Sequence, residues 1–317
     1  MYVSRVSVSE ARPALLGAIG HTPVVQLRRL AGPDCGEVWL KLESANPTGS
    51  YKDRMALAMI EGAERSGRLQ PGQAVVEYTG GSTGSSLAFV CAVKGYPLKI
   101  VTSDAFAPEK LQTMQAFGAE LNVIPSPDGI TADLIPRMME RAAEIVTEVD
   151  GYATDQFNNT DMIDGYAALG VELAEQVDGR LDAFGSYVGT AGCFLGVTRA
   201  LRRTIPGVHR AVIEPGESPV ISQGRAGTHH IEGGGVGFWP PLLGEDDFDE
   251  VFAIPEAEAF ATAARAAREE GLLCGPSTGA NIAVALKLGE RLGPGSRVAT
   301  INVDSGLKYL ARGLSLS

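Results

Sequence analysis

Short apolar runs of the kind that form buried strands alternate along the chain with segments in which apolar residues recur at helical spacing. In the first half, strands are predicted at 22–27, 37–42, 74–78, 98–102 and 120–124. Helices are predicted from Lys52 through the apolar run 55–60, and at 85–94, 108–117 and 131–147. This alternation, with short loops that contain glycine, indicates a parallel sheet wrapped by helices.

The second half, from about residue 151, shows the same alternation. Strands are predicted at 183–188, 210–214, 251–254 and 296–303, and helices at 194–203, 256–270 and 280–288. Residues 224–241 are rich in glycine, histidine and proline, which predicts a long irregular loop. The pattern therefore favours two α/β domains with a cleft between them.

Composition narrows the class of protein. With 317 residues, 44% hydrophobic, 21% charged and 39 glycines, the chain is typical of a soluble α/β enzyme with many tight turns. A formal net charge of −11 offers no surface to neutralise phosphates, so nucleic acid is not expected as a partner. An anionic substrate would need local positive potential, because the overall field opposes it.

The sequence predicts a cytoplasmic protein. The first eight residues lack the continuous apolar region of a secretory signal, and no apolar run reaches membrane-spanning length. Four cysteines (Cys35, Cys91, Cys193 and Cys274) lie far apart, without the paired spacing of a zinc site or a disulfide framework. We therefore expect a reducing compartment, no membrane contact and no metal.

The stretch 41–56 carries the first candidate for chemistry. Asn46-Pro47 predicts a turn, and the loop that follows places an N-cap candidate at Ser50. Lys52 then falls in the first turn of a helix, where the dipole disfavours an ammonium group. A lysine of this kind can offer the free amine that Schiff-base chemistry requires, although an ordinary exposed lysine fits the same local pattern.

Two glycine-rich loops precede predicted helices. Residues 79–84 and 189–193 each follow a strand, so their backbone N–H groups and the helix dipole favour an anion. Lys94 and Lys110 lie in helices and are expected to be solvated. His229 and His230 fall in the irregular loop, where a structural or solvent role is expected and a contact with substrate or a partner is the alternative.

A serine hydrolase is a rival hypothesis. Residues 80–84 and 275–279 both read G-x-S-x-G, and the first has the strand–turn–helix context of a nucleophile elbow. Among four histidines, only His229 and His230 are plausible bases. This hypothesis gives no role to Lys52.

The segment Asn46-Pro-Thr-Gly-Ser-Tyr-Lys-Asp-Arg54 resembles the pyridoxal-phosphate lysine motif of the cysteine synthase and cystathionine β-synthase family. That family belongs to the fold-type II enzymes, with the tryptophan synthase β chain. The resemblance runs from residues 19–25 to 275–279. It implies two three-layer α/β domains with mostly parallel sheets, the smaller formed by 46–150 and the larger by 1–45 with 151–317. It also implies a homodimer.

The resemblance implies two sets of site residues. The cofactor-binding set is Lys52, Ser82, Gly189, Thr190, Ala191, Gly192, Cys193 and Ser277. The substrate-binding set is Thr79, Gly80, Gly81, Ser82, Thr83 and Gln156.

This chain departs from the family pattern at three of these positions. Ser82 stands where the family has an asparagine that touches the ring 3′-oxygen, so either water bridges the contact or reactivity is retuned. Ala191 stands in a glycine-rich phosphate loop and is expected to cost little. Cys193 replaces a threonine, which gives up a hydroxyl donor worth about 1 kcal/mol and leaves a packing role.

Ser277 matches the family position that meets the pyridine nitrogen. A serine hydroxyl can hydrogen-bond that nitrogen without forcing a proton onto it, and a neutral pyridine is a weaker electron sink. Loss of a β-leaving group is then favoured over transamination or racemisation.

We therefore predict pyridoxal-phosphate-dependent β-replacement on a small amino acid, an O-activated serine, through an α-aminoacrylate. Lys52 acts as the Cα base, and a sulfur compound acts as the nucleophile. Two alternatives stay open: a β-elimination lyase (cysteine desulfhydrase or serine dehydratase) and a catalytically degenerate binding protein.

Overall fold

The computed structural model describes residues 15–127 and 133–312, and its strands form two sheets. The six-stranded sheet has the order β1 (Val24–Leu27), β2 (Glu37–Leu42), β10 (Arg297–Asn302), β7 (Ala183–Tyr187), β8 (His209–Pro215) and β9 (Glu250–Ile254). The four-stranded sheet has the order β5 (Glu120–Ile124), β4 (Leu98–Ser103), β3 (Val75–Tyr78) and β6 (Tyr152–Ala153). All named pairs are parallel except β1 with β2, which confirms the predicted mostly parallel sheets.

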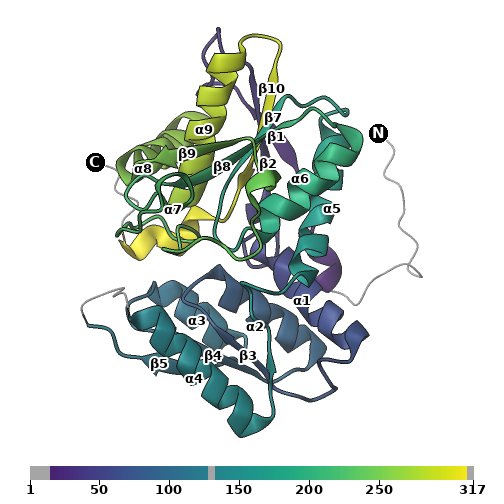
Figure 1. The fold of residues 1–317 in the computed structure, drawn as a ribbon, viewed down its shortest axis with the longest axis vertical. Coiled ribbons are helices and arrows are strands. Elements are labelled where there is room, and N and C mark those ends of the chain that lie inside the picture. Colours follow the sequence, from purple (N-terminus) through teal and green to yellow (C-terminus); the bar gives the residue numbers. More distant parts are fainter. Residues whose placement is uncertain (1–14, 128–132, 313–317) are drawn as a thin grey trace.

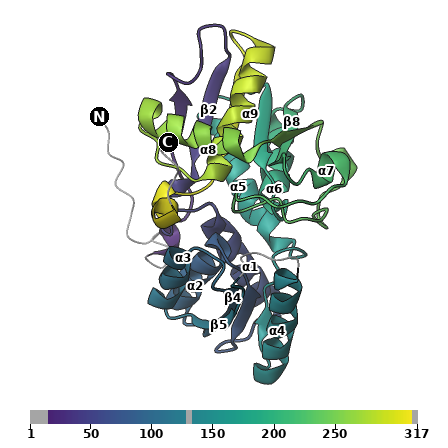
Figure 2. The same cartoon turned by 90° about the vertical axis from the view of Figure 1, so that its left-hand side faces the viewer.

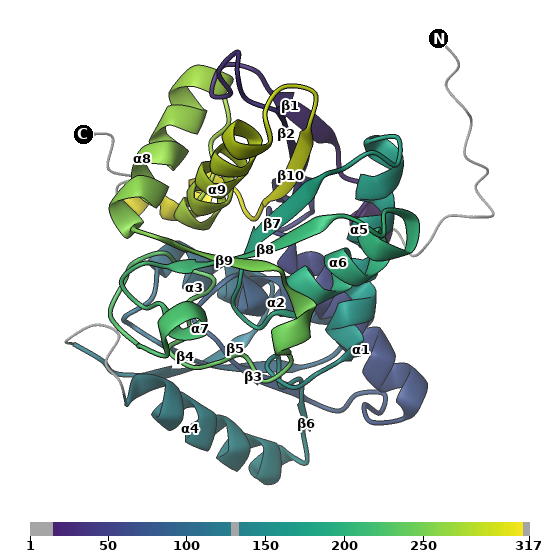
Figure 3. The ribbon, with the colours of Figure 1, turned by 45° about the horizontal axis from the view of Figure 1, so that its top comes forward.

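Helices cover both faces of each sheet, and the two sheets lie in separate lobes (Figure 1). Around the four-stranded sheet lie α1 (Lys52–Ser66), α2 (Ser82–Lys94), α3 (Pro108–Ala116) and, on the opposite face, α4 (Leu134–Val149). Around the six-stranded sheet lie α5 (Asp161–Gln176) and α6 (Gly192–Thr204) on one face, and α8 (Glu256–Arg265) and α9 (Pro276–Leu292) on the other (Figure 3). The short α7 (Val220–Gln223) follows β8.

The layers follow from the two-residue period of the strands. In β7, Phe184 packs into the core beneath α5 and α6, whereas Ala183 and Tyr187 pack into the core beneath α8 and α9. Because successive side chains point to opposite faces of a sheet, a strand that is buried on both faces places side chains in both cores. All five residues of β7 are buried.

The C-terminal segment runs between the lobes. After β10 the chain forms a 3₁₀ turn, Gly306–Arg312, which lies where the larger lobe meets α3 (Figure 2). Polar groups that follow β10 are therefore placed against the smaller lobe. This is the usual place for a site, outside the carboxyl ends of parallel strands.

Three elements were absent from the sequence prediction: α5, the four-residue helix α7 and the two-residue strand β6. Helix α5 contains Gly165 and Gly170, which lower intrinsic helix propensity. Both are needed for close packing: a Cβ at Gly165 would lie 2.5 Å from Ala58 of α1, and one at Gly170 would lie 2.7 Å from the Val197 carbonyl oxygen of α6. Tertiary packing thus overrides propensity here.

The other predicted elements are present with shifted ends. Helix α2 begins at Ser82, three residues earlier than predicted, and the helix predicted from 131 is described from Leu134, since 131–132 lie outside the described residues. The predicted irregular loop at 224–241 contains no helix or strand. Because β6 pairs with β3, the four-stranded sheet extends beyond residue 150, and the division at 46–150 stays a prediction.

Among the described helices, none combines the length and the apolar character needed to cross a membrane. The segment in which a secretory signal was sought, residues 1–8, lies outside the described residues.

Candidate active site

Lys52 is the first residue of α1, as the sequence predicted for the first helical turn. The N-cap is Tyr51 rather than Ser50, but Ser50 Oγ accepts a hydrogen bond from the Lys52 backbone N–H at 3.2 Å. The loop before the helix is fixed to the C-terminal segment, because Tyr51 N donates to the Val303 carbonyl (3.0 Å) and Ser305 N donates to the Gly49 carbonyl (2.9 Å). The lysine therefore sits on a rigid backbone.

The Lys52 side chain is a buried amine. It is 7% exposed, and its Nζ lies 4.8 Å from the centre of the Tyr51 ring. Burial lowers the pKa of Lys52 to about 8, although the charges of Cys193, Asp304 and Glu77 oppose the shift. A much larger fraction of this amine is unprotonated near neutral pH than in an exposed lysine.

Neighbouring side chains fix the orientation of the first turn of α1. Asp53 is buried and accepts hydrogen bonds from Thr48 N (2.8 Å), Thr48 Oγ1 (2.5 Å) and Ser86 Oγ (2.6 Å). Arg54 is paired with Glu43 and Glu172 at 2.8 Å in each case. Both residues that follow Lys52 are therefore anchored, which prevents the helix start from rotating.

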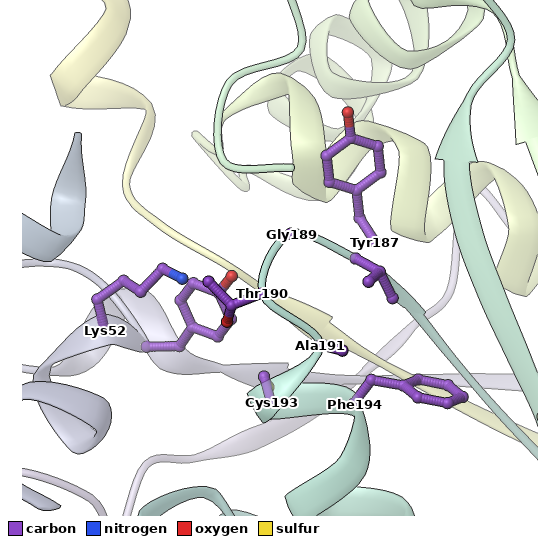
Figure 4. A pocket seen from close by; sticks show the side chains of 9 residues that line it. Lys52, Tyr187, Gly189, Thr190, Ala191, Cys193 and Phe194 are labelled. Atoms are coloured by element: carbon purple, nitrogen blue, oxygen red, sulfur yellow. The ribbon is translucent and has the colours of Figure 1, made fainter. Parts of the chain in front are cut away.

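A small cavity lies between Lys52 and the loop of residues 189–193. Figure 4 shows the Lys52 side chain reaching toward Thr190 of this loop, which precedes α6. Of the predicted cofactor set, Lys52, Gly189, Thr190, Ala191 and Cys193 line the cavity. The structure thus brings together the candidate Schiff-base lysine and the candidate phosphate loop.

Close packing explains the glycines of this loop. A Cβ at Gly189 would lie 2.6 Å from the Gly233 carbonyl oxygen, and one at Gly192 would lie 2.5 Å from Met162 Sδ. Ala191 is the N-cap of α6 and has a φ of +69°, in the left-handed region. A Cβ in this conformation costs about 1 kcal/mol of folding stability relative to glycine, whereas the expectation that alanine costs little in phosphate binding stays a prediction.

Cys193 lies in the first turn of α6 and is 7% exposed. Burial raises the pKa of its thiol well above the usual range. A thiol that stays protonated is a poor nucleophile, which supports the packing role expected for this residue.

The second loop, residues 79–84, leads into α2. Gly81 is the N-cap, and its N–H bonds to Thr79 Oγ1 at 3.1 Å. A Cβ at Gly80 would lie 2.1 Å from the Phe106 ring, so this glycine is required by packing. The N–H groups at the start of α2, together with the helix dipole, favour an anion at this position.

Gln156 lies against this loop, as the resemblance implied. Its Oε1 accepts a hydrogen bond from Thr83 Oγ1 at 2.9 Å, and its Nε2 donates to the Tyr78 carbonyl at 3.3 Å. Glu77 fixes the backbone beneath it by accepting from Gln156 N (3.3 Å) and from Thr154 Oγ1 (2.6 Å).

Sequence reasoning missed Glu77. It is 2% exposed, and burial raises its pKa to about 7 despite the hydrogen bonds that it accepts. The available signal was an acidic residue inside the apolar run 74–78.

Ser82, the departure from the family asparagine, is the first residue of α2 and contacts the C-terminal segment. Its Oγ accepts a hydrogen bond from Lys308 Nζ at 3.2 Å and lies 3.4 Å from Asp304 Oδ2. Asp304 in turn accepts from Tyr309 O–H at 2.7 Å. These three residues were missed, and their signal was a polar cluster directly after the last strand.

Ser277 lies in the first turn of α9 and is 1% exposed. Its Oγ is buried and has no hydrogen-bond partner among the described residues. A buried hydroxyl without a partner is uncommon and points to a ligand atom, which fits the ring nitrogen of the implied cofactor. Gly275 N donates to the Asp304 carbonyl (3.4 Å), so the Ser277 loop is connected to the same C-terminal segment as the lysine loop.

The serine hydrolase hypothesis receives no support from this geometry. His229 Nε2 bonds to the Gly235 carbonyl (2.8 Å), and His230 Nδ1 bonds to Glu256 (3.0 Å). Neither contacts Ser82 or Ser277, so both histidines have structural partners.

The expectation that Lys110 is solvated is wrong. It is 3% exposed and forms an ion pair with Glu232 of the 224–241 loop, with Tyr309 at its side. Lys94 is half-buried and paired with Glu64 at 2.8 Å. The helical pattern around Lys110 could not reveal that the C-terminal turn packs against α3.

Known proteins resemble this chain over most of its length. Residues 15–304 match the family described as pyridoxal-phosphate dependent enzyme. A cysteine synthase of Staphylococcus aureus is 38% identical over 295 residues, which cover 92% of this chain and 94% of that protein. Two solved structures also match: O-acetyl serine sulfhydrylase isoform 3 from Entamoeba histolytica (31% identity, TM-score 0.91, 100% and 95% coverage) and a hydrogen sulfide-producing enzyme from Fusobacterium nucleatum (31%, 0.88, 95% and 100%).

Proposed function

This chain belongs to the pyridoxal-phosphate dependent enzymes of the cysteine synthase family, and from that premise we propose that it catalyses β-replacement on an O-activated serine with a sulfur nucleophile. The observation that carries the proposal is the buried Lys52 amine, with its lowered pKa, facing the 189–193 loop across one cavity. A homodimer is expected from the same resemblance, and a cytoplasmic setting is expected from the spacing of the cysteines.

The residues present fit the cofactor. Lys52 offers an amine for covalent attachment, the N–H groups of 189–193 at the start of α6 would hold the phosphate, and Ser277 would meet the ring nitrogen. Pyridoxal phosphate, when bound, supplies an aldehyde for amines and a ring that draws electron density from Cα. Because Ser277 is a neutral hydroxyl, it does not force a proton onto that ring.

The remaining steps depend on this chain's own side chains. The N–H groups of 79–84 at the start of α2, with Gln156, would hold the α-carboxylate of the substrate and so orient its Cα. The free Lys52 amine takes the Cα proton. A pKa of about 8 suits a base that works near neutral pH. The β-group then leaves, and the nucleophile adds at Cβ.

A β-elimination lyase with the same residues is the second candidate, favoured by the structural match to a hydrogen sulfide-producing enzyme. The two differ only in whether a nucleophile or water completes the reaction. The matched test supplies the purified holoenzyme with O-acetyl-L-serine, with and without sulfide, and measures acetate, L-cysteine and pyruvate.

We expect sulfide to shift the product from pyruvate to L-cysteine. Pyruvate at the same rate in both conditions would favour the lyase. No acetate from wild-type protein would favour the degenerate binding protein. Lys52→Ala is the control and should release no acetate above background.

A further inference from the structure

Asp304 is a buried acidic residue to which the proposed reaction gives no role. It directly follows β10, in the segment that passes between two candidate loops. Tyr51 N of the lysine loop donates to the Val303 carbonyl (3.0 Å), and Gly275 N of the Ser277 loop donates to the Asp304 carbonyl (3.4 Å). The residue is therefore flanked by the candidate cofactor lysine on one side and the candidate ring-nitrogen serine on the other.

The Asp304 side chain points to the smaller lobe and keeps one oxygen free. It is 3% exposed; Oδ2 accepts from Tyr309 O–H (2.7 Å) and lies 3.4 Å from Ser82 Oγ at the start of α2. Its Oδ1 is buried and has no hydrogen-bond partner within the described ranges. A buried carboxyl oxygen without a donor is uncommon. Oδ1 lies against the Ser277 loop, where a Cβ added at Gly275 would be 2.5 Å from it, and Oδ2 is the oxygen that faces the loop proposed to hold the substrate.

Charged groups surround this carboxyl. Lys308 Nζ donates to Ser82 Oγ (3.2 Å), and Lys110 lies 3.5 Å from the Tyr309 hydroxyl while paired with Glu232. Burial raises the pKa of Asp304, whereas Lys110, Lys308 and the Tyr309 hydrogen bond lower it, and Glu232 raises it further. Lys52 also interacts with Asp304 electrostatically.

We propose that Asp304 exchanges a proton with the β-substituent of the substrate, so that the site accepts amino acids whose β-thiol or β-hydroxyl must be protonated to leave, L-cysteine and L-serine. This inference rests on the proposed function and extends its substrate class beyond O-activated serines. An activated carboxylate ester needs no such proton, because carboxylic acids ionise near pH 4, whereas thiols ionise near 8.5 and water only near 15.7.

The proton balance closes within the site. Lys52 takes the Cα proton, and the electron pair of that bond forms the Cα–Cβ double bond as the Cβ–S or Cβ–O bond breaks. The pair of the broken bond stays on the sulfur or oxygen, which takes the proton of Asp304 and leaves as hydrogen sulfide or water. When a thiol adds at Cβ, Lys52 returns its proton to Cα and the thiol proton returns to the Asp304 carboxylate. When no thiol adds, water hydrolyses the released enamine to pyruvate and ammonia, and the proton held by Lys52 passes through solvent to Asp304.

The test compares two substrates on the holoenzyme. For wild type and Asp304→Asn, kcat/KM is measured for sulfide release from L-cysteine and for acetate release from O-acetyl-L-serine. Asparagine keeps the shape and can still accept the Tyr309 hydrogen bond. We expect the cysteine-to-acetylserine ratio of kcat/KM to fall at least about 100-fold, the usual contribution of a positioned general acid.

Asp53→Asn is the matched control. Asp53 is equally buried but has its hydrogen bonds filled by Thr48 and Ser86, so its loss should lower both reactions in the same proportion. Absorbance of the bound cofactor monitors the integrity of each variant. An unchanged ratio in Asp304→Asn, whatever the absolute rates, overturns the proposal.

A second variant, Tyr309→Phe, still tests the proposal if Asp304→Asn does not fold. Tyr309→Phe removes a hydrogen bond that favours the Asp304 carboxylate, so the pH at which sulfide release from L-cysteine declines should move upward, with no matching move for acetate release. Absence of that selective shift would contradict the proposal.

The activities of the wild-type enzyme distinguish a failure of the proposed Asp304 role from a failure of the proposed function. If the enzyme releases acetate from O-acetyl-L-serine but releases neither sulfide from L-cysteine nor pyruvate from L-serine, the proposed role of Asp304 is overturned and the proposed function stands. Inertness toward all three substrates removes the proposed function, and the role of Asp304 with it.

Discussion

Two buried groups of charged side chains flank Lys52, and they differ in how completely they are paired. The paired cluster is Lys41, Glu43, Arg54 and Glu172, joined by ion pairs of 2.7–2.8 Å. The open cluster is Ser82, Lys110, Glu232, Asp304, Lys308 and Tyr309.

In the paired cluster the two acids are matched by two cations. Burial raises the pKa of Glu172, but hydrogen bonds from Arg54 and Lys41 outweigh it and lower that pKa to about 2. In the open cluster, Asp304 keeps a buried oxygen that receives no hydrogen bond from any residue the structure describes. The difference suggests that the first group positions α1, whereas the second is arranged around a ligand.

The largest expected effect comes from breaking the paired cluster. Arg54→Met removes the cation shared by Glu43 and Glu172, and leaves Glu43, which is fully buried, as an uncompensated carboxylate. We expect the free energy of unfolding to fall by about 3–5 kcal/mol. Urea unfolding of the apoprotein measures this, with Arg65→Met as control, because Arg65 is 68% exposed and should change stability by less than about 0.5 kcal/mol. A loss below 1 kcal/mol in Arg54→Met would show that the cluster does not anchor the helix.

The next largest expected effect follows from the lowered pKa of Lys52. With a folded pKa of about 8 instead of 10.5, the amine at neutral pH should be free in a fraction about 300-fold larger than in an exposed lysine. The rate at which apoprotein attaches pyridoxal phosphate, followed by visible absorbance, should therefore rise about tenfold per pH unit up to pH 8 and then level off. A rate that continues to rise past pH 9.5 would mean that the amine is not desolvated.

Glu77 tests the carboxylate-binding side of the site. Its folded pKa of about 7 lies above its ordinary value of 4.5, so the folded state binds the extra proton and the stability from this group is lost as pH rises through 7. Relative to Glu77→Gln, the wild-type free energy of unfolding should fall by about 2–3 kcal/mol between pH 5 and pH 8. Parallel pH profiles for the two proteins would show that Glu77 is not titrating in this range.

The smallest expected effect concerns the phosphate loop. Ala191→Gly relieves the left-handed conformation at φ +69°, although glycine raises the entropy of the unfolded chain, and a net gain of about 0.5–1 kcal/mol in the free energy of unfolding is expected. Ala200→Gly, within the same helix α6, is the control and should destabilise. A loss of stability in Ala191→Gly would contradict the assigned strain.

Local pattern predicted much of the fold and the cofactor side of the site. Lys52 at a helix start and the glycines of 189–193 between strand and helix are local features, and the structure places them at one cavity. Helix α5 was missed because Gly165 and Gly170, which allow it to pack closely, weaken its sequence signal.

The open cluster could not be predicted in the same way. Ser82, Lys110, Glu232 and Asp304 come from four separate segments, and only the return of the chain after β10 brings them together. Sequence spacing carries no information about contacts of that kind. The helical pattern accordingly predicts Lys110 in solvent, and the polar cluster after the last strand does not reveal which groups Asp304 meets.

The central claim is that Lys52 carries the cofactor. The direct measurement is to saturate the protein with pyridoxal phosphate, reduce it with borohydride, digest it and locate the modified lysine by mass spectrometry. The account predicts a single pyridoxyl group on Lys52, absent from Lys52→Ala. Modification at another lysine, or an unmodified Lys52 in protein that has turned yellow, would contradict it.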